Sequence, residues 1–209
     1  MIKTLRARAL LGLGVVTLLG SGLVAGTAGT ASANGPAASR VSRDAALDPF
    51  TVVSPDFRDG GFLPPSVELG GPAGQGVCKG ENSAPKLSWY NVPAGTKSFT
   101  MTITDVDAPV AGGWHHWVVY NIPANHPWLI GHGQNPFSEG TTSFGTTGYG
   151  GPCPPPTGEP HHYVFTVYAL TVSHISGAHL TYSQLMTKIA ADIQDATSIV
   201  GLFSLPLNS

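Results

Sequence analysis

The 209-residue chain is rich in Gly (27) and Pro (18) and poor in charged residues (11%), which favours short strands and turns over long helices. Apart from three basic residues near the N-terminus, seven Lys/Arg stand against twelve Asp/Glu, a net charge of −5 with His neutral. This balance argues against a nucleic-acid partner, because proteins that bind nucleic acids present a basic face.

The first 33 residues have the pattern of a secretory signal peptide. A basic start (Lys3–Arg8) precedes an apolar run (Ala9–Val24) and the small residues Ala31–Ala33. The alternative is a retained membrane anchor, but the run is short and Gly-rich for a spanning helix. The residue directly after the predicted cleavage site is Asn34 and not Cys, which argues against a lipoprotein. We expect a secreted, periplasmic or cell-surface protein with no stable membrane span in its mature form.

The remaining chain suits one domain. Residues 34–48 are predicted to be a flexible arm, and residues 49–209 a folded domain. The folded domain is expected to begin with a short strand at Phe50–Val53, followed by turns and an edge strand within Gly60–Gly76. A second strand is predicted at Lys86–Tyr90 and a turn at Asn91–Thr96.

The stretch Ser98–Asp105 alternates strictly between polar and apolar residues, the period of a half-buried strand. Phe99, Met101 and Ile103 occupy the inward positions, and Asp105 continues the same row. Burying a lone carboxylate is costly unless it is paired or hydrogen-bonded. We therefore expect a polar partner, or water, at the end of this strand.

A second strand, Trp114–Asn121, carries His115 and His116. Adjacent side chains on a strand point to opposite faces, so at most one of these two can meet Asp105. The pattern of residues leaves open which one does.

The segment Pro123–Gly148 has no sustained periodicity and is predicted to be a long surface loop, a kind of loop that is often functional. The Gly/Pro-rich Gly148–Pro160 leads into a strand at His161–Thr171, whose two apolar faces indicate a central position. His161 and Tyr163 share strand parity and so lie on one face.

Thr181 opens a predicted helix, with Gln184 three residues on in a capping-box pattern. Leu185, Ile189 and Ile193 recur on one helical face, and the helix is expected to fade near Asp195–Thr197. A last strand is predicted at residues 198–204.

The two cysteines, Cys78 and Cys153, are an even count in a chain predicted to be exported, which favours a disulfide over two buried free thiols. Such a bridge would stabilise the fold by about 4 kcal/mol on the chain-entropy model.

The residues bear on several kinds of chemistry. No metal site and no cofactor are expected, because the adjacent histidines face apart and no Cys or carboxylate stands at a recognised ligand spacing. Gly-x-Ser-x-Gly is absent, so a nucleophilic triad is disfavoured. Asp105 with a His could act as an acid–base pair. The turn Gly148–Gly151 favours anion binding more strongly, since its backbone N–H groups could form a nest beside the donors of His161 and Tyr163.

Four segments together resemble the phosphatidylethanolamine-binding protein family, also called the Raf kinase inhibitor-like family. The first signature lies in Asp105–Pro109 and Gly113–Trp117, and the second in Gly148–Pro155 and His161–Leu170. The segment from Cys78 through Asn82 to Trp89 resembles the bacterial branch.

The resemblance implies a mostly β fold, an antiparallel β-sandwich with a few peripheral helices, one near the C-terminus, and a small anion pocket at one end. It chooses His116 over His115. The implied ligand-binding residues are Asp105, Pro109, His116, Gly151, Cys153, Pro155, His161 and Tyr163. Two positions depart from the family pattern, with Val106 in place of Pro and His162 in place of Arg. The His would make an ion pair with Asp107 dependent on pH.

From these observations we expect a protein that binds a small anion, a phosphate ester or a phospholipid headgroup. Inhibition of a serine protease, through the long loop at residues 123–148, is an alternative, and an enzyme that uses Asp105 and His116 as its acid–base pair is another. The charge balance leaves no role for nucleic acid.

Overall fold

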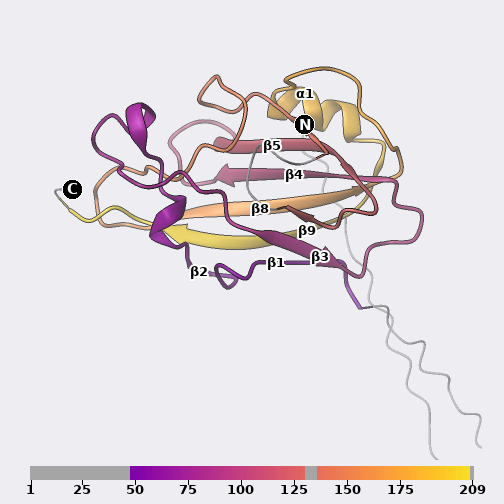
Figure 1. The fold of residues 1–209 in the computed structure, drawn as a ribbon, viewed down its shortest axis with the longest axis horizontal. Helices are drawn as coiled ribbons and strands as arrows, with labels where there is room; N and C mark the ends of the chain where they lie inside the picture. The colour runs from indigo at the N-terminus through magenta and orange to yellow at the C-terminus, as the bar shows by residue number, and fades with distance from the viewer. Residues whose placement is uncertain (1–47, 130–135, 208–209) are drawn as a thin grey trace, which may run out of the picture. The chain divides into compact units, whose positions relative to one another are not determined.

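The computed structural model describes residues 48–129 and 136–207, and Figure 1 shows their fold. The predicted signal peptide, all but the end of the predicted arm, and residues 130–135 of the long loop lie outside the described residues.

Two β-sheets form the folded domain. The larger has the strand order β2-β9-β8-β4-β5-β7 and the smaller the order β1-β3-β6. Every pairing between these strands is antiparallel except the edge pair β2–β9. The strands are β1 Thr51–Val53, β2 Gly61–Phe62, β3 Leu87–Tyr90, β4 Ser98–Asp105, β5 Trp114–Pro123, β6 Trp128–Leu129, β7 Ser138–Glu139, β8 His161–Leu170 and β9 Ile193–Phe203.

The helices are peripheral, as predicted. One α-helix, α1 (Tyr182–Ile189), and two short 3₁₀ helices, η1 (Pro65–Val67) and η2 (Gly71–Gly74), occur in the described residues. Leu185 and Ile189 of α1 pack with Val118 in a cluster separate from the one that holds the β3 residues, so α1 and β3 cover opposite faces of the large sheet. Figure 1 shows α1 near β5, with β1 and β3 near β9. The mostly β sandwich is confirmed, with one parallel pair at its edge.

The main core lies between the two sheets. Phe99, Met101 and Ile103 of β4 are buried there with Trp89 of β3, and the Phe99 ring meets the Trp89 ring edge to face. The inward row of β4 was therefore predicted correctly. The central position of β8 is also confirmed, because this strand lies between β9 and β4.

The other face of β4 is covered as well, so the prediction of a half-buried strand is wrong. Thr100 and Thr102 are also buried. Thr102 pairs with Val118 of β5, and Val118 belongs to a second hydrophobic cluster that includes Leu185 and Ile189 of α1. The helix covers this face, so threonines that look solvent-facing in the sequence are shielded from water.

The helix begins as predicted but ends early. Thr181 and Gln184 form the capping box, in which each side chain accepts a hydrogen bond from the other residue's backbone N–H. The helix stops at Ile189, and Ile193, predicted to lie on its apolar face, instead starts β9 and pairs with Leu170. Residues from Ile193 onward pair with β8 along its whole length, and this pairing outweighs their local helical pattern.

The segments predicted as loops contain short pieces of regular structure. The predicted edge strand in residues 60–76 is β2, which is accompanied by η1 and η2, and the described parts of the long loop at residues 123–148 contain β6 and β7. No helix within the described ranges has the length and apolar character needed to cross a bilayer.

A disulfide joins Cys78 to Cys153, with their Cα atoms 5.8 Å apart. It ties the segment after η2 to the Gly/Pro-rich turn that precedes β8.

Candidate functional site

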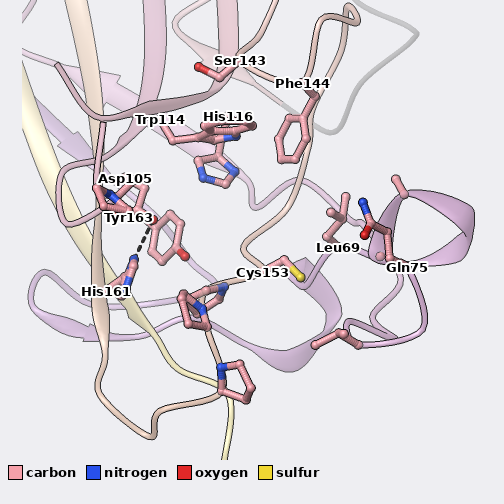
Figure 2. Close-up of a pocket in the computed structure, with 18 residues that line it drawn as sticks. Leu69, Gln75, Asp105, Trp114, His116, Ser143, Phe144, Cys153, His161 and Tyr163 are labelled. Carbon is pink, nitrogen blue, oxygen red and sulfur yellow. Dashed lines mark hydrogen bonds and ion pairs between the residues drawn. The ribbon is translucent and has the colours of Figure 1, made fainter. Parts of the chain in front are cut away.

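A cavity of about 610 Å³ lies where β4 ends and where β5 and β8 begin. These ends coincide because both strands run antiparallel to β4, with Asp105 opposite Trp114 on one side and Tyr163 on the other. Figure 2 shows the side chains that line it. Seven of the eight residues predicted to bind a ligand are among them, namely Asp105, Pro109, His116, Cys153, Pro155, His161 and Tyr163.

A β-bulge turns His116 toward the cavity. The register passes from Ile103 opposite Trp117 to Thr104 opposite His115, so β5 carries one residue more than β4. That extra residue is His116, and its side chain points to the side of Tyr163, whose ring it meets edge to face at 5.1 Å. Bulges next to functional sites commonly re-aim a side chain in this way.

The neighbouring His115 lies on the opposite face of the sheet. Its ring stacks on Tyr182 of α1 with the ring centroids 3.8 Å apart, and its Nδ1 lies 3.0 Å from the Thr104 hydroxyl oxygen. In a regular strand, side chains two positions apart share a face, so His115 would point inward like Trp117. Because of the bulge, His116 points inward instead.

Asp105 meets His161 inside the cavity. Its Oδ2 accepts a hydrogen bond from His161 Nδ1 at 2.7 Å, and its Oδ1 accepts one from the Asp107 backbone N–H at 3.0 Å. Both carboxylate oxygens are thus satisfied, as burial requires. The sequence allowed an acid–base pair of Asp105 with His116, whereas the structure joins Asp105 to His161.

His116 is held by the backbone of the Gly-rich turn. Its Nδ1 lies 2.6 Å from the Gly150 carbonyl oxygen, and its ring also packs edge to face against Phe144. Burial lowers the pKa of His116 to about 4, against the smaller opposing effects of the Gly150 carbonyl and the Asp105 carboxylate. The imidazole is therefore neutral near pH 7.

The Tyr163 hydroxyl is buried and has no hydrogen-bond partner among the described residues. Burial, together with the nearby Asp105 charge, raises the pKa of Tyr163 well above its usual value, so the group remains a phenol. Buried polar atoms without partners are rare in folded proteins. The hydroxyl is a donor at the cavity wall, near the Asp105 carboxylate but without a hydrogen bond of good geometry to any described residue.

A backbone nest for an anion was predicted at Gly148–Gly151, but the N–H groups of its last two residues already donate hydrogen bonds within the protein. The Gly150 N–H donates to the His116 carbonyl oxygen at 2.9 Å, and the Gly151 N–H donates to Asn82 Oδ1 at 2.7 Å. Gly151 is also the one predicted ligand-binding residue that does not line the cavity. These two glycines shape the turn and leave ligand contacts to side chains.

Sequence reasoning missed two residues, one that holds the turn beside the cavity and one that lines the cavity itself. Asn82 clamps the turn, since its amide also donates to the Tyr149 carbonyl oxygen. Phe144 comes from the long loop and packs against Trp114 and His116. No periodicity marked Phe144, whereas Asn82 stood within the motif Cys78–Asn82 that carried part of the family resemblance.

The two departures from the family pattern have visible consequences. The Val106 N–H donates to the His162 carbonyl oxygen at 3.1 Å, a bond that a proline could not make. His162 pairs with Asp107, whose Oδ2 accepts from the His162 backbone N–H and lies 2.8 Å from its Nδ1. Slight burial opposes the shift, but these contacts hold the pKa of Asp107 below its ordinary value.

The charge of the cavity is modest. Of the described residues that line it, none is Lys or Arg, and Asp105 is the one carboxylate. Nor do the described ranges contain a group of three His, Cys, Asp or Glu side chains placed to hold a metal ion.

Comparison with known proteins identifies the family. The sequence profile of the phosphatidylethanolamine-binding protein family matches residues 53–204. The chain therefore belongs to this family.

Its relatives include bacterial proteins of the UPF0098 group. It is 40% identical to the UPF0098 protein YbhB of Escherichia coli over 166 residues, covering 73% of this chain and 99% of YbhB. It is 36% identical to the "Putative lipoprotein LppC" of Mycobacterium tuberculosis over 160 residues, covering 76% and 74% of the two chains.

The fold is also that of a solved structure. The crystal structure of E. coli YbcL, a member of the same family, matches with a TM-score of 0.69 and 34% sequence identity, covering 75% of this chain and 98% of YbcL.

Proposed function

We propose that this protein binds a small anion of the phosphate-ester or phospholipid-headgroup class in the cavity at the end of β4. The observation that carries the proposal is the buried Tyr163 hydroxyl, a donor with no partner in the described part of the chain. It stands beside the Asp105–His161 pair at the wall of a cavity large enough for a small ligand. Family membership supports the same ligand class.

The lining favours ligands of low net charge. With no Lys or Arg on the described wall and one carboxylate, Asp105, a multiply charged anion lacks a cation to balance it. A zwitterion such as phosphoethanolamine suits this wall better, because its ammonium group can lie near the Asp105 carboxylate.

Tyr163→Phe tests the proposal, because it removes the hydroxyl and keeps the ring. Calorimetric titration with O-phosphoethanolamine should show a dissociation constant about five- to tenfold higher in the variant, as expected for one lost hydrogen bond. The free energy of unfolding without ligand should stay the same or rise, since an unpartnered buried hydroxyl is removed.

The matched control is His115→Ala, one residue from His116 but on the α1 face of the sheet. It should leave the dissociation constant unchanged, whereas His116→Ala should weaken binding by about 1–3 kcal/mol. Unaltered binding in both Tyr163→Phe and His116→Ala would remove the cavity as the site.

Export is part of this proposal. The signal-peptide pattern of the first 33 residues, the Cys78–Cys153 disulfide and the similarity to a protein named as a lipoprotein support it. The intact mass of the protein recovered from its producing cells should correspond to a chain that begins at Asn34.

Inhibition of a partner protein is a second candidate. Trp128, on the segment at residues 123–148, is 39% exposed and packs against the ring of His126. Exposed tryptophans are frequent anchors in protein interfaces. Trp128→Ala should then abolish inhibition of a serine protease and leave phosphoethanolamine binding intact.

A further inference from the structure

His116 presents a hydrogen-bond acceptor to the cavity. Its Nδ1 lies 2.6 Å from the Gly150 carbonyl oxygen, and a carbonyl can only accept, so Nδ1 carries the proton. A neutral imidazole has a single N–H, which leaves a lone pair on Nε2. Figure 2 shows the ring beside Phe144 and above Tyr163, at the wall of the cavity.

The groups around His116 do not change this protonation state at moderate pH. The Asp105 carboxylate favours a protonated ring and His115 on the same strand disfavours it, while Tyr163 and Phe144 pack against it without charge. Burial outweighs these effects and keeps the pKa of His116 at about 4.

A ligand in this cavity therefore meets two opposite requirements. The Tyr163 hydroxyl needs an acceptor and His116 Nε2 needs a donor. A fully deprotonated oxyanion satisfies the first and places a lone pair against Nε2. A singly protonated phosphate monoester satisfies both, because its P–O⁻ oxygens accept and its P–OH donates.

We propose that the cavity selects oxyacids that retain a proton, with phosphate monoesters as the ligand class, by accepting the P–OH hydrogen bond at His116 Nε2. This inference rests on the proposed anion-binding function. It disfavours sulfate esters, which keep no proton near neutral pH, and phosphodiesters, whose single acidic proton is lost. A free phosphomonoester is therefore preferred to the diester of an intact phospholipid.

Three esters of ethanolamine test the selection at pH 5.5 by calorimetric titration, and two of them, the phosphate and the sulfate, have nearly the same shape. The phosphate group of O-phosphoethanolamine is mostly singly protonated there, because its second pKa is about 6. Ethanolamine O-sulfate has the same charge without the proton, and glycerophosphoethanolamine is the diester. We expect O-phosphoethanolamine to bind at least about tenfold more tightly than either.

The preference should disappear in His116→Ala and persist in His115→Ala, with thermal unfolding of each variant showing that it is folded. Equal dissociation constants for the three probes in the wild type would overturn the selection and leave the proposed function standing. Binding of none of the three at millimolar concentration would overturn both.

A measurement without ligand examines the cause directly. Long-range ¹H–¹⁵N NMR spectra distinguish protonated from unprotonated ring nitrogens. His116 should show a protonated Nδ1 and an unprotonated Nε2 between pH 5.5 and 8. An Nε2–H tautomer, or a doubly protonated ring, would contradict the inference whatever the affinities are.

Discussion

Two Asp–His pairs connect the end of β4 with the start of β8, and they differ mainly in exposure. Asp105 meets His161 at 2.7 Å, and Asp107 meets His162 at 2.8 Å. The side chains of the first pair are 6% and 15% exposed, and those of the second are 42% and 50% exposed. The same chemistry at nearly the same distance thus occurs once at the wall of a cavity and once in contact with solvent.

The difference shows how burial sets the importance of a polar contact. Water can replace a lost partner at Asp107 and His162, so that pair is worth little. Loss of Asp105 leaves buried donors without an acceptor, which costs far more than the contact itself contributes. The exposed pair shapes the backbone at the cavity edge, while the buried pair fixes the orientation of His161 within the cavity.

The largest expected effect is that of removing the buried carboxylate. Asp105→Ala deprives His161 Nδ1 and the Asp107 N–H of their acceptor and should lower the free energy of unfolding by about 3–4 kcal/mol. Asp107→Ala should lower it by less than about 1 kcal/mol. Urea denaturation at pH 7 measures both. Similar losses in the two variants would show that burial does not separate the pairs.

A second prediction concerns how the free energy of unfolding depends on pH through the buried His116 and the exposed Asp107. The folded state holds the pKa of His116 at about 4, below the value of 6.5 for a free histidine. Between these two values the His116 side chain is protonated in the unfolded chain and neutral in the folded protein. The free energy of unfolding therefore falls as the pH drops from about 6.5 to 4. The loss from this one group should reach about 3 kcal/mol.

The difference in unfolding free energy between wild type and His116→Gln, measured across this range, isolates the contribution of His116. This difference should change with pH between 4 and 6.5 and stay constant above pH 6.5. Asp107 has a lowered pKa and contributes in another window, because its stabilisation is lost only below its ordinary value of 3.8. A flat difference between pH 4 and 6.5 would mean that His116 is protonated in the fold.

Much of this arrangement could be predicted from local sequence patterns. The two-residue period gave the limits of β4, and the same parity brought Asp105, His161 and Tyr163 to one end of the sheet. These inferences succeeded because side-chain direction along a regular strand depends only on position.

The remainder depends on how distant segments pair. The bulge at His116 is a property of the register between β4 and β5, which no local period encodes. The use of the Gly150 and Gly151 N–H groups by His116 and Asn82 likewise requires contacts across 34 and 69 positions of the chain. The early end of α1 follows from the pairing of β9 with β8, where Ile193 meets Leu170.

The smallest expected effect concerns the exposed pair. His162→Arg introduces the residue usual in the family, and a guanidinium stays charged where an imidazole becomes neutral. The ion pair with Asp107 should then persist at pH 8, with a gain of about 0.5 kcal/mol in the free energy of unfolding, and a smaller gain at pH 5.5. In an Asp107→Asn background the gain at pH 8 should vanish, since the double-mutant cycle isolates this one interaction. The same gain at both pH values, or its persistence without Asp107, would show that Arg acts through packing rather than through its charge.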